Sequence, residues 1–139
     1  MNIEEKDLLL KDLCARLKYG VKASVYSYWN EEYVDDYIVG VDIEEDDFLC
    51  STIPGVRCEI ILTKPYLIPL SSMNDEQKKE YTHIVNYISS DDTDNWKEGE
   101  FIYAEQLDQL MHFYHKNHID YRGLIEKGLA IDATNLKIY

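Results

Sequence analysis

Positive charge is scarce in this sequence, and it is missing altogether from residues 23–56, which contain no Lys or Arg. The whole chain has 27 Asp and Glu residues against 14 Lys and Arg, so its formal net charge is -13. Nucleic acids and anionic membranes bind proteins through basic surfaces. The charge balance therefore predicts no direct binding to DNA, RNA or a membrane.

Long apolar runs and the signatures of known catalytic sites are also absent. No stretch approaches the roughly 20 apolar residues that a membrane-spanning helix needs, and residues 1–5 lack the basic and apolar regions of a signal peptide. We therefore expect a cytoplasmic protein. The sequence has no Walker loop and no GxGxxG, GxSxG or HExxH motif, so it indicates no particular enzyme class and no cofactor.

Cysteine is sparse, with three residues and no CxxC spacing. This odd count argues against a framework of disulfides and against a structural zinc site. Small buried side chains are the simpler expectation. One disulfide stays open, because a three-residue loop at 53–55 would set Cys50 opposite Cys58, whereas a two-residue turn at 54–55 would set Cys50 opposite Glu59.

A chain of 139 residues with 45% hydrophobic content is long enough to form a single domain over residues 1–139. Residues 3–17 read as its first helix. Asn2 and Glu5 form a capping-box pair before it, and Gly20 provides a stop after it. The predicted buried stripe of this helix consists of Leu10, Leu13, Cys14 and Leu17.

Four strand-like runs rich in β-branched and aromatic residues follow, at residues 21–29, 33–43, 48–53 and 56–62. Apolar and polar residues alternate in the first two runs, so each strand is expected to bury one face. The short connections predict an antiparallel meander, either open or rolled into a small SH3-like barrel, with Gly40 as a bulge or bend. The positions expected to point inward are Val21, Ala23, Val25, Val39, Val41 and Ile43.

Two prolines four residues apart, Pro65 and Pro69, follow the strands. Proline fixes φ and lacks a backbone donor, so residues 64–74 are expected to form an extended arm that lies across the sheet without being a central strand. Asn74 with Gln77 forms a second capping-box pair, which predicts that a helix begins directly after the arm.

Two further helices are expected, because residues 75–89 and 103–117 carry apolar side chains at helical spacing, and the polar residues 89–100 between them read as a loop. Asp120 is placed to cap a short third helix at 121–127, and the tail would add an edge strand. The predicted fold class is therefore α+β: an N-terminal helix, a small antiparallel β-meander or SH3-like barrel, an extended Pro-rich arm and two or three C-terminal helices.

Three stretches of the sequence form a recognisable set: LLKDLCARLKYGVK at residues 9–22, KPYLIPLSSM at 64–73 and DYRGLIEKGLA at 120–130. With them the chain resembles a group of short uncharacterised proteins of gut-bacterial phages and mobile elements, in which LLKDLxARLxYGVK, KPYLxPLSSM and DYRGLIEKGLA recur in this order. The resemblance implies a phage or mobile-element origin. It implies no activity, ligand or site residue.

Asp108, His112 and His115 share one face of the predicted helix at 103–117, since they are four and three residues apart. Carboxylate and imidazole ligands at this spacing can meet one metal ion, so a small metal-binding protein or enzyme is the alternative function. The opposing interpretation is a solvated face with ordinary histidines. Cys14 is a poor candidate nucleophile, because a buried thiol has a raised pKa.

Nine carboxylates fall between residues 31 and 47. Such a run is usually a solvated face, and the sharper interpretation is a surface that imitates the phosphates of a nucleic acid and binds a basic protein. Neighbouring tyrosines and Trp29 would supply aromatic anchors. The candidate partner-binding residues are Glu31, Glu32, Tyr33, Asp35, Asp36, Glu44, Glu45, Asp46 and Asp47.

The sequence thus favours a non-enzymatic protein-interaction module whose acidic aromatic face binds a basic host or phage protein. This function needs no metal and no cofactor. A third hypothesis is an assembly subunit that joins copies of itself through an exposed apolar arm.

Overall fold

The structure is a computed structural model that describes residues 1–42, 44–45, 47–50, 57–89 and 96–139, with the backbone alone at residues 57, 87–89 and 96–104. It confirms the predicted α+β class. In chain order the elements are α1 (Ile3–Arg16), β1 (Lys22–Ser27), β2 (Glu32–Asp42), β3 (Asp47–Cys50), β4 (Arg57–Glu59), β5 (Thr63–Pro69), α2 (Asp75–Ser89), α3 (Trp96–Lys116), β6 (Ile119–Asp120) and β7 (Ile131–Asp132).

Strands β1 to β4 form an antiparallel meander, and β5 returns to pair with β1, which gives the strand order β4-β3-β2-β1-β5-β6. The register of β2 against β3 shifts between Ile38 and Gly40, where a bulge was expected. A Cβ atom at position 40 would lie 3.2 Å from Cδ1 of Leu49, so glycine suits this close approach. A one-turn 3-10 helix, Ile60–Leu62, connects β4 to β5.

The Pro-rich arm is extended as predicted, but the prediction that it is not a central strand is wrong. β5 lies between β1 on one side and β6 and β7 on the other. Pro65, opposite Ala23, belongs to the last pair of the β1 ladder, and Pro69, opposite Asp120, belongs to the last pair of the β6 ladder. Each proline therefore lies at the end of a ladder, where a missing N–H is tolerated.

The arm buries two of its apolar side chains: Tyr66 is 8% exposed and Leu67 is 0% exposed. Leu70, at the end of the arm, is 38% exposed. Copies of the chain therefore cannot join through Tyr66 and Leu67 without opening the sheet.

Helix α1 buries a different stripe from the predicted one, and the prediction of a buried Cys14 is wrong. The Cys14 thiol is exposed, although partial desolvation still raises its pKa. The reason for the difference is an ion pair between Asp12 and Arg16, which occupies two positions of the stripe. The buried residues of α1 are Leu9, Asp12, Leu13 and Arg16.

Both predicted capping boxes form. The amide of Glu5 donates to Oδ1 of Asn2 at 2.8 Å, and the amide of Asn2 donates to Oε2 of Glu5 at 3.0 Å. The amide of Gln77 donates to Oδ1 of Asn74 at 2.8 Å, and the return bond to Gln77 Oε1 is 2.9 Å long. These bonds satisfy orphan donors and fix where α1 and α2 begin.

The predicted short helix at 121–127 is wrong, because the chain forms turns there. Asp120 still acts as the cap: its two carboxylate oxygens accept hydrogen bonds from the amides of Leu124 and Ile125, each at 2.9 Å. One buried carboxylate thus closes the loop without a helix. The tail adds β7, which runs parallel to β5.

Some predictions fall outside the described residues, namely the inward-pointing Ile43, the turn at 53–55, Asp46 and half of the polar loop at 89–100. From Trp96 onward that loop belongs to α3, so the loop prediction is wrong there.

Cys50 and Cys58 form a disulfide that joins β3 to β4. The β3–β4 ladder sets Cys58 opposite Phe48, so neither of the two expected registers occurs and the bridge joins diagonal positions. Both cysteines are buried, as expected, but as a disulfide and not as thiols.

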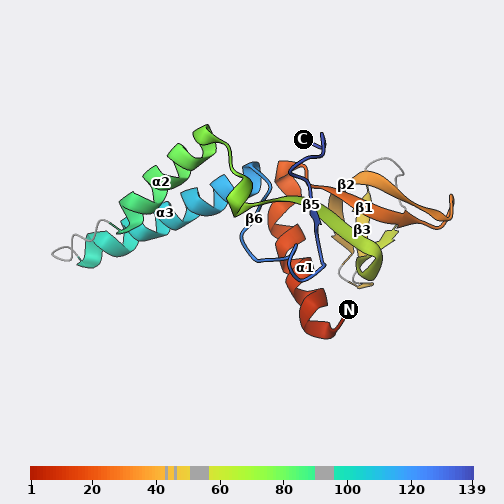
Figure 1. Cartoon of the computed structure of the whole chain (residues 1–139). Helices are drawn as coiled ribbons and strands as arrows, with labels where there is room; N and C mark the ends of the chain where they lie inside the picture. Colours follow the sequence, from red (N-terminus) through yellow and green to blue (C-terminus); the bar gives the residue numbers. More distant parts are fainter. Residues whose placement is uncertain (43, 46, 51–56, 90–95) are drawn as a thin grey trace.

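Two apolar clusters hold the chain together. The larger cluster packs α1 and residues 124–130 against the inner face of the sheet. The smaller one, built around Ile84, Phe113, Tyr114 and Ile119, joins α2 and α3 to β6. Figure 1 shows the α2–α3 hairpin projecting at one end of the molecule and the β1–β2 hairpin reaching out at the other. No helix of the described part is long and apolar enough to cross a membrane.

Candidate partner-binding face

An exposed group of large apolar side chains covers the outer side of β1, β2 and the turn between them. The exposed fraction is 91% for Trp29, 61% for Tyr28 and 58% for Tyr33. Single exposed apolar residues are ordinary, whereas contiguous ones mark binding surfaces. The group, named the aromatic face below, consists of the exposed Tyr28, Trp29, Tyr33, Tyr37 and Val39 together with the half-buried Tyr26.

The strand register explains why these residues share one side. Tyr26 lies opposite Tyr33 in the β1–β2 ladder. Because side chains alternate along a strand, the odd-numbered residues of β2 from 33 to 39 point outward. The even-numbered Asp36 and Ile38 are buried on the inner side.

The rings of the aromatic face support one another. The ring centroid of Tyr26 lies 5.0 Å from that of Tyr28 and 5.2 Å from that of Tyr33, with both pairs arranged edge to face. This geometry is favourable for aromatic pairs. The rings of Tyr26, Tyr28 and Tyr33 therefore restrict one another before any partner arrives, which reduces the entropy cost of binding at these three residues.

Carboxylates border the aromatic face. Glu31 and Glu32 are exposed beside Trp29. Tyr28 donates a hydrogen bond from its hydroxyl to Oε1 of Glu59 at 2.9 Å. This bond raises the pKa of Tyr28. Glu59 lies opposite Asp47 in the β3–β4 ladder, so the start of β3 is near Tyr28.

Asp35 anchors the face to the neighbouring strand. The hydroxyl of Tyr66 on β5 donates to Oδ1 of Asp35 at 2.6 Å. Burial and the hydrogen bond to Asp35 together raise the pKa of Tyr66 to about 12. Tyr66 therefore stays a donor at neutral pH and holds the carboxylate of Asp35 in place between Tyr33 and Tyr37.

One lysine already shows how the face receives a cation. The ammonium nitrogen of Lys22 lies 5.6 Å from the ring centroid of Tyr37. A cation over an aromatic ring is attracted by the ring quadrupole, and the effect is stronger where water is excluded. The aromatic face with its bordering carboxylates can therefore hold Lys and Arg side chains of another molecule.

The structure separates the predicted partner-binding residues. Tyr33 and Asp35 lie exposed at the aromatic face, Glu31 and Glu32 are exposed at the end of the hairpin beside it, and Glu44 and Glu45 are exposed in the turn between β2 and β3. Asp47 is partly buried at the start of β3. Asp36 is 5% exposed on the inner side of β2, so its inclusion is corrected: it cannot contact a partner. Asp46 lies outside the described residues.

The proposed metal ligands do not come together. Asp108 and His112 are exposed, and Nδ1 of His112 lies 2.7 Å from the hydroxyl of Tyr19. His115 is buried, and its Nε2 lies 2.9 Å from the hydroxyl of Tyr121. The described residues contain no group of three His, Cys, Asp or Glu side chains that could hold a metal ion. The histidines instead join α3 to the residues packed against it.

A buried charged centre, which sequence reasoning missed, lies under α1. Nε of Arg16 is 2.7 Å from Oδ2 of Asp12, and Nε of Arg122 is 3.2 Å from Oδ1 of the same carboxylate. Arg16 also donates to the carbonyl of Ile119 at 2.8 Å. The i, i+4 spacing of Asp12 and Arg16 was the signal in the sequence that could have indicated this ion pair. Asp12 and Arg16 are both 0% exposed, so the centre contributes to stability and cannot contact a partner.

His115 is buried and His118 is half-buried, so we expect the free energy of unfolding to depend on pH. Burial, with the nearby Arg16 charge, lowers the pKa of His115 and of His118 to about 4 from about 6.5. Above pH 6.5 both are neutral in the folded and unfolded chain, whereas below it only the unfolded chain takes up protons. We expect the free energy of unfolding to fall by about 3 kcal/mol for the pair between pH 7 and pH 4.5, after allowance for partial solvent contact.

Urea unfolding at a series of pH values measures this loss. The variant with His115→Gln and His118→Gln is expected to lose less stability over the same range. An identical pH dependence in both proteins would show that these histidines do not carry the effect.

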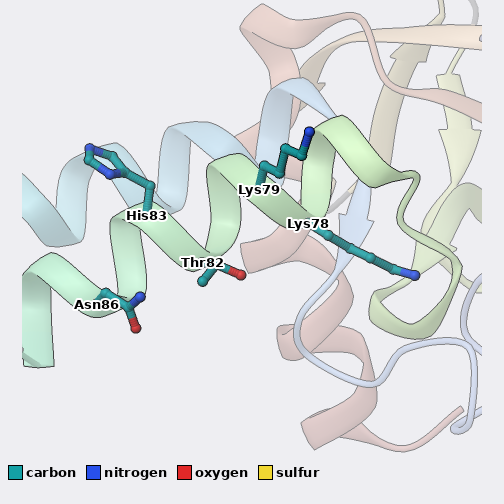
Figure 2. A pocket seen from close by; sticks show the side chains of 5 residues that line it. All are labelled: Lys78, Lys79, Thr82, His83 and Asn86. Atoms are coloured by element: carbon teal, nitrogen blue, oxygen red, sulfur yellow. The ribbon is translucent and has the colours of Figure 1, made fainter.

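Two hollows lie away from the aromatic face. Figure 2 shows the larger, of about 380 Å³, on the outer side of α2, where the five lining side chains diverge along one helix and so do not converge on a ligand. The smaller, of about 300 Å³, lies between the end of α3 and the tail. There the ring of His118 stacks on Tyr139 with a centroid distance of 3.5 Å, and the Tyr139 hydroxyl donates to the carbonyl of Tyr66 at 2.8 Å. This contact fastens the tail to β5.

No protein-family model, curated protein sequence or solved structure matches this chain.

Proposed function

We propose that the chain is a cytoplasmic, non-enzymatic protein-interaction module of phage or mobile-element origin, and that its aromatic face, bordered by carboxylates, binds a basic partner protein. The origin rests on the three sequence motifs at residues 9–22, 64–73 and 120–130. The binding rests on the face itself.

The observation that carries the proposal is the exposure of Tyr28, Trp29 and Tyr33 on one strand hairpin, where Tyr28 and Tyr33 both pack against the ring of Tyr26. Leaving these side chains in water forgoes the favourable burial of large aromatic groups. Tyr and Trp are also the residues that most often dominate binding energy at protein interfaces. A surface of this kind is explained by a partner that covers it.

The charges around the face select a basic partner. Glu31, Glu32 and Asp35 are exposed within or beside it, and Glu44, Glu45 and Asp47 add negative charge from the next turn. An acidic partner would place like charges together, which costs several kcal/mol at an interface. A basic partner would gain from attraction to the carboxylates and from cations over the rings.

A labelled peptide that alternates Lys and Val is a suitable probe, with fluorescence anisotropy as the measurement. We expect binding that weakens as salt is raised toward about 0.15 M and beyond, because screening shortens the reach of surface charges. Replacing Glu31 and Glu32 with Gln is expected to weaken binding about fivefold, since two exposed charges contribute a few tenths to one kcal/mol each.

The matched control carries the same change of charge elsewhere. Glu105 and Asp108 are exposed on α3, in the hairpin at the other end of the molecule. The variant with Glu105→Gln and Asp108→Asn is expected to bind the peptide almost as well as the unaltered chain. An equal loss in both variants would mean that net charge, and not the aromatic face, determines binding.

A further inference from the structure

The backbone of β2 shows how a basic segment would bind, provided that the proposed function holds. The amide of Ile38 donates to the carbonyl of Val21 at 3.0 Å. This bond fixes the phase of the β1–β2 ladder, because backbone groups of an antiparallel strand point alternately to one neighbour and to the other. The even-numbered residues of β2 therefore direct their N–H and C=O groups toward β1.

The odd-numbered residues direct their backbone groups toward the other edge. There the described part of β3 pairs with β2 from Ile38 to Asp42. No described strand pairs with that edge over Tyr33 and Asp35. At the next odd position the amide of Tyr37 donates to Oδ1 of Asp36 at 2.7 Å.

The same edge carries the exposed side chains of the aromatic face. Tyr33 and Asp35, whose backbone groups point to the open edge, are also the residues whose side chains point outward. A strand laid against this edge would therefore bring its own side chains beside both the rings and the carboxylates. Backbone hydrogen bonds would supply affinity, and alternate side chains would supply specificity.

The acidic side chains argue against a second copy of this chain as the added strand. Open edges invite pairing between identical molecules, and charged side chains oppose it. Two copies paired edge to edge would bring Glu32 and Asp35 of one copy near the same carboxylates of the other. Like charges placed across strands destabilise a sheet.

We propose that the partner binds as an added antiparallel β-strand along the open edge of β2 at Tyr33 and Asp35, with Lys or Arg at alternate positions. In an antiparallel pair, residues directly opposite each other have side chains on the same face. The basic residues opposite Tyr33 and Asp35 thus have both their side chains over the aromatic face and their amides toward β2. The intervening residues lie beside the half-buried Val34 and are apolar.

Two modified forms of the alternating Lys and Val peptide test this arrangement against the full chain. One is N-methylated at the Lys amides, which removes the donors that face β2, and the other is N-methylated at the Val amides, which face solvent. We expect the first to bind at least about tenfold more weakly than the unmodified peptide, and the second to bind within about twofold of it. Hydrogen exchange at the amides of Tyr33 and Asp35 should slow when the unmodified peptide is bound.

Equal affinities of the two methylated peptides would overturn strand addition. If they still bind in a salt-dependent manner, the proposed function stands and only the binding mode fails. If the unmodified peptide itself does not bind, the proposed function fails first.

Discussion

Replacing Arg16 with methionine is expected to lower the free energy of unfolding by about 3–5 kcal/mol, because it leaves the buried carboxylate of Asp12 without its main partner. Arg16 and Asp12 are 0% exposed, and two of the guanidinium nitrogens contact the two carboxylate oxygens at 2.7 and 3.1 Å. Arg122 alone, at 3.2 Å and partly in solvent, cannot replace these contacts. The variant also loses the bond to the carbonyl of Ile119, which ties α1 to β6.

Urea unfolding followed by circular dichroism measures the loss. Lys11→Met, an exposed position on the same helix, is the control and should change stability by no more than about 0.5 kcal/mol. A double variant with Asp12→Leu and Arg16→Met should recover part of the loss, because no unpaired buried charge remains. A single Arg16→Met variant as stable as the control would show that the ion pair contributes little.

Replacing Trp29 with alanine is expected to weaken binding of the alternating Lys and Val peptide by about 30-fold, the effect of losing a central aromatic anchor. The Trp29 side chain is 91% exposed in the free chain, so its removal should leave the free energy of unfolding unchanged. This variant is thus expected to lose affinity without losing stability. Truncating a residue of the core would lower the free energy of unfolding as well.

Leu107→Ala is the matched control, because Leu107 is also a large exposed apolar side chain, 52% exposed on α3. We expect it to change neither affinity nor stability. Tyr33→Ala should behave like Trp29→Ala, although with some loss of stability from its contact with the ring of Tyr26. Unchanged affinity in both Trp29→Ala and Tyr33→Ala would contradict the aromatic face as the binding surface.

Local patterns in the sequence were sufficient to predict where α1 and α2 begin and that the strands form an antiparallel meander. The capping boxes at Asn2 and Asn74 depend on residues three apart, so no tertiary information is needed to find them. The bulge at Gly40 was also predictable, since a glycine within a strand pattern usually marks one. The antiparallel meander of β1 to β4 follows from short turns between neighbouring strands.

What the sequence could not show depends on contacts between distant residues. The buried stripe of α1 contains Asp12 and Arg16, and a pattern of apolar residues cannot identify charges that are buried because they pair. A proline excludes a central strand only where it lies within a ladder of hydrogen bonds. The pairing of β5 with β1 and β6 places both prolines at ladder ends, and the sequence alone does not show that pairing.

The residue types of the candidate face were predictable, but the side of the sheet on which each residue lies was not. Tyr33 and Asp35 were identified from composition, and the structure places both on the outer side of β2. Val39 was expected to point inward, yet it is 56% exposed, because the bulge at Gly40 reverses the alternation along β2. Asp36 was assigned to the surface for being charged, although the strand phase buries it.

The most direct test of the central claim compares two peptides that differ only in the sign of their charge, one alternating Lys with Val and the other alternating Glu with Val. The account predicts that the full chain binds the Lys peptide, that this affinity falls as salt is raised, and that the Glu peptide does not bind. Equal affinity for both peptides, or affinity for the Lys peptide that salt does not change, would contradict it.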